Sequence, residues 1–321
     1  MSKLQRRQLL LASAAALAVP ARAQEKYPSR PVRIIVGLTP GGVADAAVRL
    51  LTAAMQPSFG QPLLVENKPG ASFQLAFGAL SQAAADGYTL LHIISPMLSA
   101  QAVHKRFDIF KSLVPVAGMA STDTTFAVGG SSKFKSMQEL IAYGRANPGK
   151  LTYGSPGNGT LEHIALAGFF KRYAIDAVHV PFKGGPEIVQ ALATGQIDLG
   201  TQAVPLVVQF APKSMTRALV ILNHKRNPAV PDVPTIKEAG MDLNRLTLWG
   251  GLAALAGTPK PLLELLEAKA LAAARDPALL KQYQQMGLDS DPKSAAAFGQ
   301  DWKDDWGWIS KSAAENRIEG N

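Results

Sequence analysis

A glycine-rich turn near the N-terminus has the residue types of an anion-binding site. The apolar run 32–36 leads into a Gly-Gly pair, and a helical pattern begins at Val43. Glycine lets backbone N–H groups approach a ligand closely, and a helix start favours negative charge. The turn therefore predicts a cradle for a carboxylate or a phosphate, with an ordinary strand-to-helix turn as the alternative. The candidate ligand contacts are Leu38, Thr39, Gly41, Gly42 and Asp45.

A second turn in the middle of the chain has the same pattern. An apolar run ending at Gly154 leads into a glycine-rich loop, and a helical pattern follows from Thr160. Thr160 is the expected N-cap of that helix, which leaves Ser155 and the loop N–H groups, including that of Gly157, free for a ligand. A flexible capped turn is the alternative. Because two such turns occur, a shared anion site is the favoured interpretation.

Two further segments are candidate contributors to the same site. Pro181 and Lys183 precede another Gly-Gly pair, where the lysine could reach an anion, although a solvated lysine is the more common case. Ser95 and Met97 directly follow an apolar run that is predicted as a strand. Ligands of open α/β sheets bind at the carboxyl ends of strands, so both segments are candidate contacts.

The sequence offers little for catalysis, cofactors or metals. It has no cysteine, and its five histidines form neither H-x-x-x-H nor H-E-x-x-H, so a thiolate nucleophile and a zinc hydrolase site are not expected. The first turn is not G-x-G-x-x-G, and no P-loop lysine follows it. Ser95 and Ser155 lack a G-x-S-x-G elbow. A hydrolase or transferase acting through Ser155 or His163 is the enzyme alternative, but no partner that would orient a base is evident, so we expect neither an enzyme nor a bound cofactor.

Residues 1–23 have the layout of a secretory signal. A basic start is followed by the apolar run 9–19 and by the cleavage site Ala21-Arg22-Ala23. The run is too short to span a bilayer, which takes about 20 residues, so export to the periplasm by the Sec route or, given Arg6-Arg7, the twin-arginine route is expected. Removing this segment lowers the basic residues from 33 to 29 against 24 acids, and the net charge from +9 to about +5. Without a basic stripe, nucleic-acid binding is not expected.

Short apolar runs alternate with helical patterns along the rest of the chain, which is typical of parallel sheets covered on both faces. Strands are expected at 32–36, 62–65, 88–94, 124–128, 151–154, 177–180, 197–200, 217–222 and 246–255. Helices are expected at 43–55, 73–85, 136–146, 160–173, 186–193, 261–274, 277–286 and 294–314. The pattern predicts two α/β lobes joined by more than one crossing: 24–122 begins lobe 1, 123–240 forms lobe 2, and 241–321 returns to lobe 1.

Ten short motifs in a fixed order cover essentially the whole chain after the signal. They are 27–33 (YPSRPVR), 40–42 (PGG), 65–71 (VENKPGA), 86–91 (DGYTLL), 147–151 (NPGKL), 179–184 (HVPFKG), 231–235 (PDVPT), 238–240 (EAG), 249–251 (WGG) and 257–259 (GTP). In this order they resemble the Bug family, the periplasmic substrate-binding proteins of tripartite tricarboxylate transporters.

The resemblance implies a two-lobed periplasmic binding protein of the Venus flytrap type II, with two crossovers between the lobes and no enzymatic activity. It implies a small organic carboxylate held mainly by backbone N–H groups of the loops at 38–42, after Ile94, at 155–160 and at 181–184. It also implies a monomer that delivers its ligand to integral membrane transporter subunits. A ligand sensor that acts through a sensor protein without a dedicated permease is the alternative.

Three departures from the family pattern bear on the ligand. The first loop begins Gly37-Leu38-Thr39-Pro40 where the family usually has Pro-Phe-x-Pro, and the segment 72–75 has fewer glycines than usual. Gln202 stands where an acidic residue is common, and an acidic side chain would be the natural partner of a ligand ammonium group. We therefore include Gln202 among the site residues and predict a carboxylate without an ammonium group, either a dicarboxylate or an aromatic acid.

Overall fold

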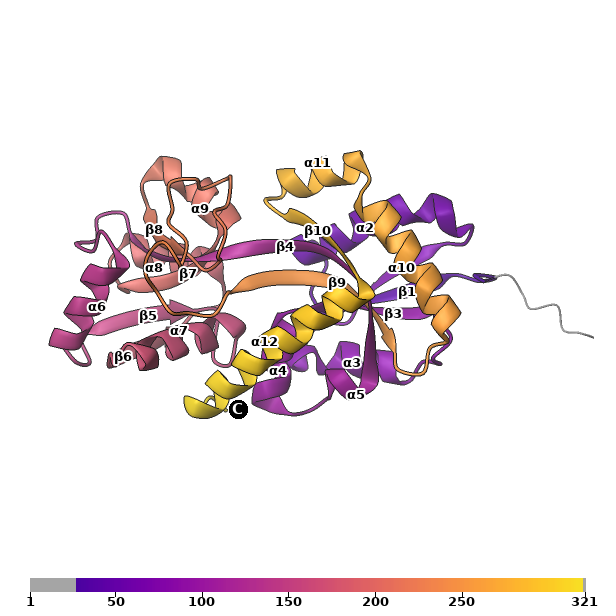
Figure 1. The fold of residues 1–321 in the computed structure, drawn as a ribbon, viewed down its shortest axis with the longest axis horizontal. Helices are drawn as coiled ribbons and strands as arrows, with labels where there is room; N and C mark the ends of the chain where they lie inside the picture. The colour runs from indigo at the N-terminus through magenta and orange to yellow at the C-terminus, as the bar shows by residue number, and fades with distance from the viewer. Residues whose placement is uncertain (1–26, 320–321) are drawn as a thin grey trace, which may run out of the picture.

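The computed structural model describes residues 27–319, so the predicted signal at 1–23 lies outside the described residues. The chain forms two α/β lobes side by side along the long axis of the molecule (Figure 1). The strands are β1 (Val32–Val36), β2 (Leu63–Asn67), β3 (Thr89–Ile94), β4 (Leu113–Gly129), β5 (Leu151–Ser155), β6 (Ala177–Pro181), β7 (Leu199–Ala203), β8 (Thr216–Ile221), β9 (Thr247–Leu255) and β10 (Asp289–Ser294).

Helices cover both faces of the sheet. They are α2 (Val43–Phe59), α3 (Gln74–Ser81), α4 (Pro96–His104), α5 (Ile109–Ser112), α6 (Met137–Ala146), α7 (Leu161–Arg172), α8 (Gly185–Ala193), α9 (Val204–Phe210), α10 (Lys260–Ala274), α11 (Pro277–Gln285) and α12 (Ala295–Glu315), with short 3-10 turns at Ala71–Phe73 and Ala211–Lys213. Within residues 27–319, no helix is long and apolar enough to cross a membrane.

The strand order is β2-β1-β3-β9-β4-β7-β5-β6, with β8 and β10 also paired to β4. Strands β2, β1 and β3 are parallel in one lobe, and β7, β5 and β6 are parallel in the other. The central strands β9 and β4 run antiparallel to their neighbours. The expected parallel sheets are therefore correct within each lobe, but the lobes are joined by antiparallel strands.

Strand β4 belongs to both lobes. Its residues 113–123 pair with β9, and its residues 124–129 pair with β7 and β8. The residues of β4 from Val116 onward are nearly all buried, because both faces of this strand are covered. Strands β4 and β9 are the two extended segments that cross from one lobe to the other (Figure 1), in agreement with the expected two crossovers.

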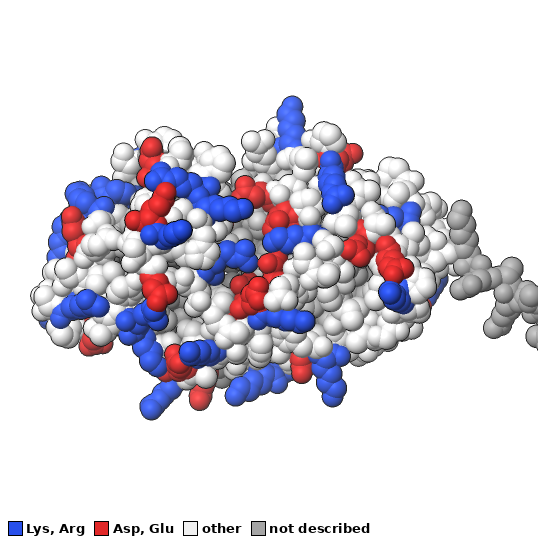
Figure 2. All heavy atoms as spheres, in the orientation of Figure 1, with Lys and Arg blue, Asp and Glu red and all other residues white. Residues whose placement is uncertain are grey.

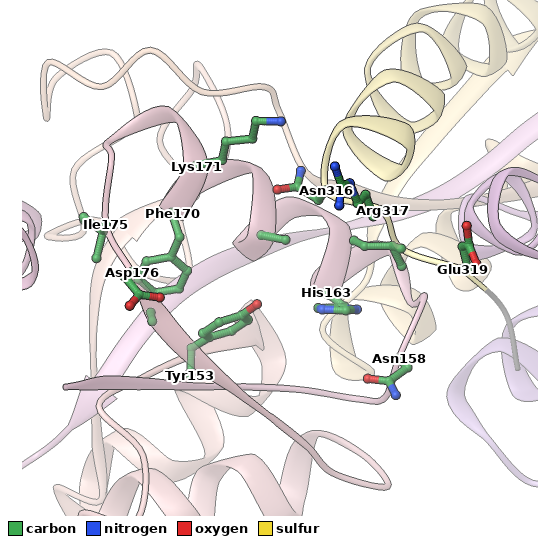
Figure 3. Close-up of a pocket in the computed structure, with 13 residues that line it drawn as sticks. Tyr153, Asn158, His163, Phe170, Lys171, Ile175, Asp176, Asn316, Arg317 and Glu319 are labelled. Atoms are coloured by element: carbon green, nitrogen blue, oxygen red, sulfur yellow. The ribbon is translucent and has the colours of Figure 1, made fainter. Parts of the chain in front are cut away.

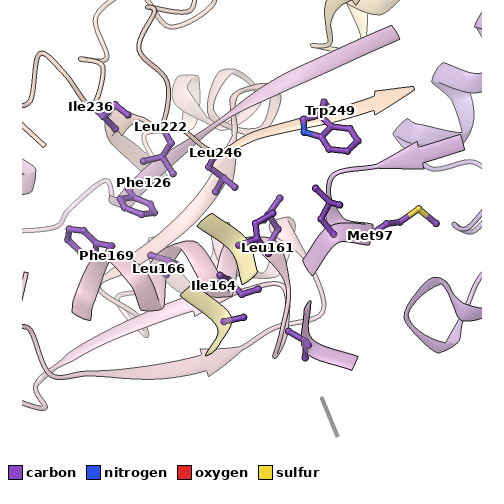
Figure 4. Close-up of a cluster of buried hydrophobic side chains, with 14 of the residues drawn as sticks. Met97, Phe126, Leu161, Ile164, Leu166, Phe169, Leu222, Ile236, Leu246 and Trp249 are labelled. Atoms are coloured by element: carbon purple, nitrogen blue, oxygen red, sulfur yellow. The ribbon is translucent and has the colours of Figure 1, made fainter. Parts of the chain in front are cut away.

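Helix α12 also bridges the lobes. It packs on α4 and β4 at one end and on α7 at the other. Trp249 on β9 lies 4% exposed against Phe298 and Trp302 of this helix, and its indole N–H donates to Asp305 at 2.5 Å. One apolar cluster consequently runs from Met97 through Trp249 and Leu161 to Phe126 and Phe169 (Figure 4).

Most strands and helices expected from the sequence are present within a few residues of their predicted bounds. The expected N-cap Thr160 is confirmed, since it accepts from His163 N–H, and Ser136 caps α6 in the same way by accepting from Glu139 N–H. The sequence patterns did not predict α4, α5, α9, β10 or the first half of β4. That half of β4 contains Pro115 and Gly118, which obscure the strand pattern, and β10 has the polar sequence DSDPKS.

Candidate functional site

The carboxyl ends of the strands in the two lobes face each other across the middle of β4. Strand β3 ends at Ile94, which pairs with Gly250, and Gly250 in turn pairs with Ala120 of β4. In the other lobe, β7 ends at Ala203, which pairs with Thr124 of β4. Four residues of extended chain span about 13 Å. The loops that follow these strand ends therefore border one region between the lobes. Figure 2 shows a notch between the two lobes at the top of the view.

The loop after β1, residues 38–45, is the lobe 1 turn, and its tip faces solvent. Thr39, Gly41 and Gly42 are exposed, whereas Asp45 is 2% exposed. The Asp45 carboxylate accepts from Gly41 N–H and Arg49 Nε at 2.9 Å and from Asn67 Nδ2 at 2.8 Å. Burial alone would raise the pKa of Asp45, but these hydrogen bonds outweigh it and lower the pKa to about 2. Asp45 therefore holds the turn, and the exposed backbone is left for a ligand.

Asn67 is a supporting residue that the sequence reading did not single out. Its Nδ2 donates both to Asp45 and to the carbonyl of Leu38 at 3.0 Å, and its Oδ1 accepts from Arg49 at 2.9 Å. Leu38 packs against the lobe 1 core as a partly buried residue. The motif VENKPG contains Asn67, so a polar residue at the carboxyl end of a strand was the signal available.

The loop after β3 is tightly packed. Ser95 is fully buried, its N–H donates to the Trp249 carbonyl at 3.0 Å, and its Oγ accepts from Trp249 N–H at 3.3 Å. Met97 is 1% exposed and lies in the apolar core. The Met97 and Phe73 side chains both face Gly37, where a Cβ would meet Phe73 at 2.8 Å. The structure thus places Met97 in the support of the lobe 1 turn.

The loop after β5, residues 155–163, is the lobe 2 turn. Thr160 caps α7 and also donates its hydroxyl hydrogen to the Gly157 carbonyl at 2.9 Å. Gly157 and Gly159 have φ of 128° and 73°, in the region that favours glycine. A Cβ at Gly159 would lie 2.9 Å from Val103 of α4. The lobe 2 turn therefore rests directly against lobe 1.

Two stacked histidines lie behind the lobe 2 turn. The rings of His163 and His179 are 3.8 Å apart and nearly parallel, at 9°. His163 Nδ1 accepts from Gly159 N–H at 3.1 Å, and His179 Nε2 lies 2.8 Å from Ser155 Oγ. Burial and the neighbouring His179 lower the pKa of His163 to about 4, and burial lowers that of His179. Both rings are neutral at pH 7 and act as hydrogen-bonding supports.

The Ser155–His179 pair has the spacing of a nucleophile and its base, so the enzyme alternative needs a geometric test. Ser155 is fully buried, and its hydroxyl also lies 3.1 Å from the Gly157 carbonyl. Among residues 27–319, no carboxylate hydrogen bonds to His179. A serine nucleophile needs access to its substrate and an oriented base, and this pair has neither. The arrangement instead fixes the lobe 2 turn.

Two remaining candidates occupy different environments. Pro181 and Lys183 are exposed, and the Lys183 N–H donates to Glu187 at 3.0 Å as α8 begins. Gln202 is 1% exposed, and its Oε1 accepts from Thr216 Oγ1 at 3.1 Å. Its Nε2 has no hydrogen-bond partner in the described chain. A solvent-facing Gln202 is therefore excluded, and its one unused group is a donor.

A metal centre finds no support in the described region. Across residues 27–319, no group of three histidine or acidic side chains is placed to hold a metal ion. The chemistry of the site loops is that of backbone N–H groups, hydroxyls and an amide, all of which suit an anion without a metal.

Sequence comparison shows which proteins this chain is similar to. The tripartite tricarboxylate transporter family receptor pattern matches residues 47–313. A protein in the gbd 5' region of Cupriavidus necator is 36% identical over 253 residues, which cover 78% of this chain and 77% of that protein. The protein BugT of Bordetella pertussis is 30% identical, with 85% of each chain covered.

Two solved structures have a similar fold. MatC from Rhodopseudomonas palustris, solved with bound malate, superposes with a TM-score of 0.74 at 27% identity and covers 89% of this chain and 99% of that one. An R. palustris protein solved with adipate gives a TM-score of 0.75 at 25% identity, covering 91% and 99%. The chain therefore belongs to the tripartite tricarboxylate transporter receptor family, the Bug-type periplasmic binding proteins.

Proposed function

We propose that this protein captures a small dicarboxylate or aromatic carboxylate between its lobes and delivers it to a tripartite tricarboxylate-type membrane transporter. The observation that carries the proposal is that β3 and β7, the strands next to those that lead into the lobe 1 and lobe 2 turns, end four residues apart along β4. Each turn presents glycine backbone at the start of a helix, which is where anions bind. Malate in MatC and adipate in its R. palustris neighbour are both dicarboxylates.

Gln202 supports a ligand without an ammonium group. Its Oε1 accepts from Thr216, and its Nε2 has no hydrogen-bond partner in the described chain. The neutral amide can donate to a carboxylate oxygen, and it offers a ligand ammonium group at most a neutral hydrogen bond, which is weaker than the bond to an ionised carboxylate. We expect succinate to bind at least tenfold more tightly than aspartate, which differs from it by one ammonium group.

The first experiment is a thermal-shift screen of the mature protein against carboxylates, followed by titration calorimetry of the hits. A ligand at 100 times its Kd stabilises the folded state by about 2.7 kcal/mol, which is easily detected. Failure of every dicarboxylate and aromatic acid to shift Tm would contradict the proposal.

Gly42→Val tests the position of the cradle. Gly42 has φ of −74°, and a Cβ there meets only Thr39 O at 3.7 Å, so the backbone tolerates a side chain. A valine would nevertheless stand where a ligand approaches the turn, and we expect most binding to be lost while the unfolding transition is retained. The matched control is Gly78→Val on α3, where a Cβ meets nothing within 4 Å. Normal binding by Gly42→Val would place the anion elsewhere.

Export and domain organisation complete the proposal. Cleavage after Ala23 would give a mature chain that begins at Gln24, and the intact mass of protein recovered from the periplasm tests this. We propose lobe boundaries at 122/123 and 240/241, and closure of the lobes on the ligand would lower the radius of gyration in small-angle scattering.

A further inference from the structure

A buried histidine, His92 of β3, lies beside the start of the lobe 1 turn. It pairs with Val36, the last residue of β1, and the lobe 1 turn begins two residues further along the chain. The side chain is 4% exposed. Burial lowers the pKa of His92 to about 4, against the opposing effect of the Asp45 carboxylate. The imidazole is therefore neutral at pH 7, with one N–H donor and one acceptor nitrogen.

His92 is the one histidine among residues 27–319 that is both buried and without a hydrogen-bond partner for its ring. The other four histidines have either a partner or contact with solvent. His163, for example, accepts from Gly159 N–H at the edge of a lobe 2 cavity (Figure 3). The rings of His104 and His179 each hydrogen bond to a serine hydroxyl, and His224 is exposed. A buried polar group without a partner costs free energy unless something outside the protein satisfies it.

The ring of His92 points toward the carboxyl end of its strand. His92 pairs with Leu252 of β9, but its Nε2 lies next to Gly250, which pairs with Ile94 at the end of β3. A Cβ on Gly250 would be only 2.9 Å from this nitrogen, so the glycine lets the ring reach its position. Gly250 is partly exposed, whereas Leu252 is fully buried. The tip of the ring therefore lies at the end of β3 that borders the region between the lobes.

The nitrogens of His92 keep some accessible surface. Neither belongs to the unpartnered side-chain atoms that are fully enclosed within residues 27–319. A hydrogen bond requires access to a single atom, so a ring that is 4% exposed can still make one. The nearby Asp45 carboxylate is already occupied by Gly41 N–H, Arg49 and Asn67, so it leaves the imidazole donor unused.

We propose that His92 is a ligand contact on the lobe 1 side of the site, and that its Nε2–H donates a hydrogen bond to a ligand carboxylate held at the lobe 1 turn. This inference rests on the proposed function, and it adds a side-chain donor to a turn that otherwise presents backbone N–H groups. A carboxylate oxygen is an acceptor that matches the donor of a neutral imidazole.

The missing partner leads to a distinctive expectation for His92→Leu. The substitution breaks no hydrogen bond within the described chain, and it replaces a buried polar ring by an apolar side chain of similar size. Replacement of an unpartnered polar group by an apolar one is neutral or stabilising. We therefore expect the variant to lose ligand affinity without losing stability, whereas a residue that supports the fold would lose both.

The test is titration calorimetry of the mature protein with succinate, adipate and benzoate, combined with urea unfolding in the absence of ligand. For each probe that binds the unmodified protein, we expect His92→Leu to weaken binding at least tenfold, with an unchanged or higher urea midpoint. His92→Gln should recover most of the affinity, because its side-chain amide retains an N–H donor. The imidazole Nε2 resonance of His92 should shift in ¹⁵N NMR when a bound probe is added.

The matched control is Thr52→Val on α2. Thr52 is a buried polar residue of the same lobe, and its hydroxyl donates only to the Arg49 carbonyl of its own helix at 2.8 Å, so the variant should bind the probes normally. Equal binding by His92→Leu and the unmodified protein, or an unmoved His92 resonance, would overturn the contact and leave the proposed function intact. Loss of both binding and stability in His92→Leu and His92→Gln would show a structural role and also overturn it. If the unmodified protein bound none of the probes and no other carboxylate, the proposed function would fail and this contact with it.

Discussion

The lobe 1 turn and the lobe 2 turn begin with the same pattern of strand, glycines and helix, but different chemistry holds them. Asp45, Arg49 and Asn67 fix the lobe 1 turn through an ionised carboxylate. Ser155, Thr160 and two neutral imidazoles fix the lobe 2 turn. Two turns with the same backbone pattern can thus be held in place either by a charged group or by neutral groups. The kind of supporting group determines the pH range and the substitutions that disrupt each turn.

The turns also differ in their surroundings. The tip of the lobe 1 turn is exposed, as is Val43 at 57%, whereas Gly159 of the lobe 2 turn is buried against Val103. A substitution in the lobe 1 turn should therefore act on the ligand, and one in the lobe 2 turn should act on the contact between the lobes.

The largest expected effect is that of Asp45→Ala. It removes the acceptor of hydrogen bonds from Gly41 N–H, Arg49 Nε and Asn67 Nδ2, and hydrogen bonds to a charged group contribute roughly 1.5–3 kcal/mol. We expect a loss of about 3 kcal/mol in the free energy of unfolding in urea and at least a tenfold loss of ligand affinity. Asp108→Ala is the control, since Asp108 accepts only from Lys111 N–H at the start of α5 and should cost about 1 kcal/mol. Equal effects of the two substitutions would contradict the proposed role of Asp45.

Gly159→Ala should have the next largest effect. An alanine with φ of 73° costs roughly 1–2 kcal/mol, and its Cβ would also meet Val103 at 2.9 Å. Gly195→Ala is the matched control, because Gly195 has nearly the same φ of 72° and a Cβ there would meet nothing within 4 Å. We expect Gly159→Ala to be the more destabilising of the two in urea denaturation, and Val103→Ala to restore part of the difference. No rescue by Val103→Ala would show that this contact is unimportant.

The two turns should also fail in different pH ranges. The pKa of His163 is lowered from 6.5 to about 4, so the neutral ring stabilises the fold fully above pH 6.5, and this contribution is lost as the pH falls toward 4. The pKa of Asp45 is lowered from 3.8 to about 2, so its contribution persists until the pH falls below about 4. Urea midpoints measured from pH 7 to pH 3 should fall in the upper range first, and His163→Gln should reduce that fall but not abolish it, because burial also lowers the pKa of His92 to about 4. An unchanged profile in His163→Gln would refute this assignment.

The sequence predicted the positions of both turns but not their supports. Strand, glycine and helix patterns are local, so the segments around Gly41 and Gly157 could be located without a structure. The contacts of Asn67 with Leu38 and of His179 with Ser155 join residues 29 and 24 positions apart, and no local pattern encodes them. How close the ends of β3 and β7 lie along β4 depends on the register of paired strands, and no local sequence pattern predicts that register.

Met97 illustrates the same limit. Its position after a strand predicted a ligand contact, but helix α4 turns its side chain into the apolar core beside Phe73 and Gly37. The sequence predicts that Met97 follows the strand β3, as the structure has it. The direction of its side chain depends on helix α4, which begins at Pro96 and which the hydrophobic periodicity did not predict.

The smallest expected effect concerns ligand choice at Gln202 and bears on the lobe 2 side of the site. Gln202→Glu replaces the unused Nε2 donor by an acceptor that carries charge, while Oε1 can still accept from Thr216. A ligand carboxylate should then bind less tightly and a ligand ammonium group more tightly, because bonds to charged groups exceed neutral ones by roughly 1 kcal/mol. We expect the ratio of the Kd for aspartate to that for succinate to fall about tenfold in titration calorimetry. Gln101→Glu is the matched control, a buried glutamine in α4 whose Oε1 accepts from Ile109 N–H, and it should leave the ratio unchanged. If Gln202→Glu also left the ratio unchanged, the amide would be a structural partner of Thr216 alone, and the selection against amino acids would have to come from the loops themselves.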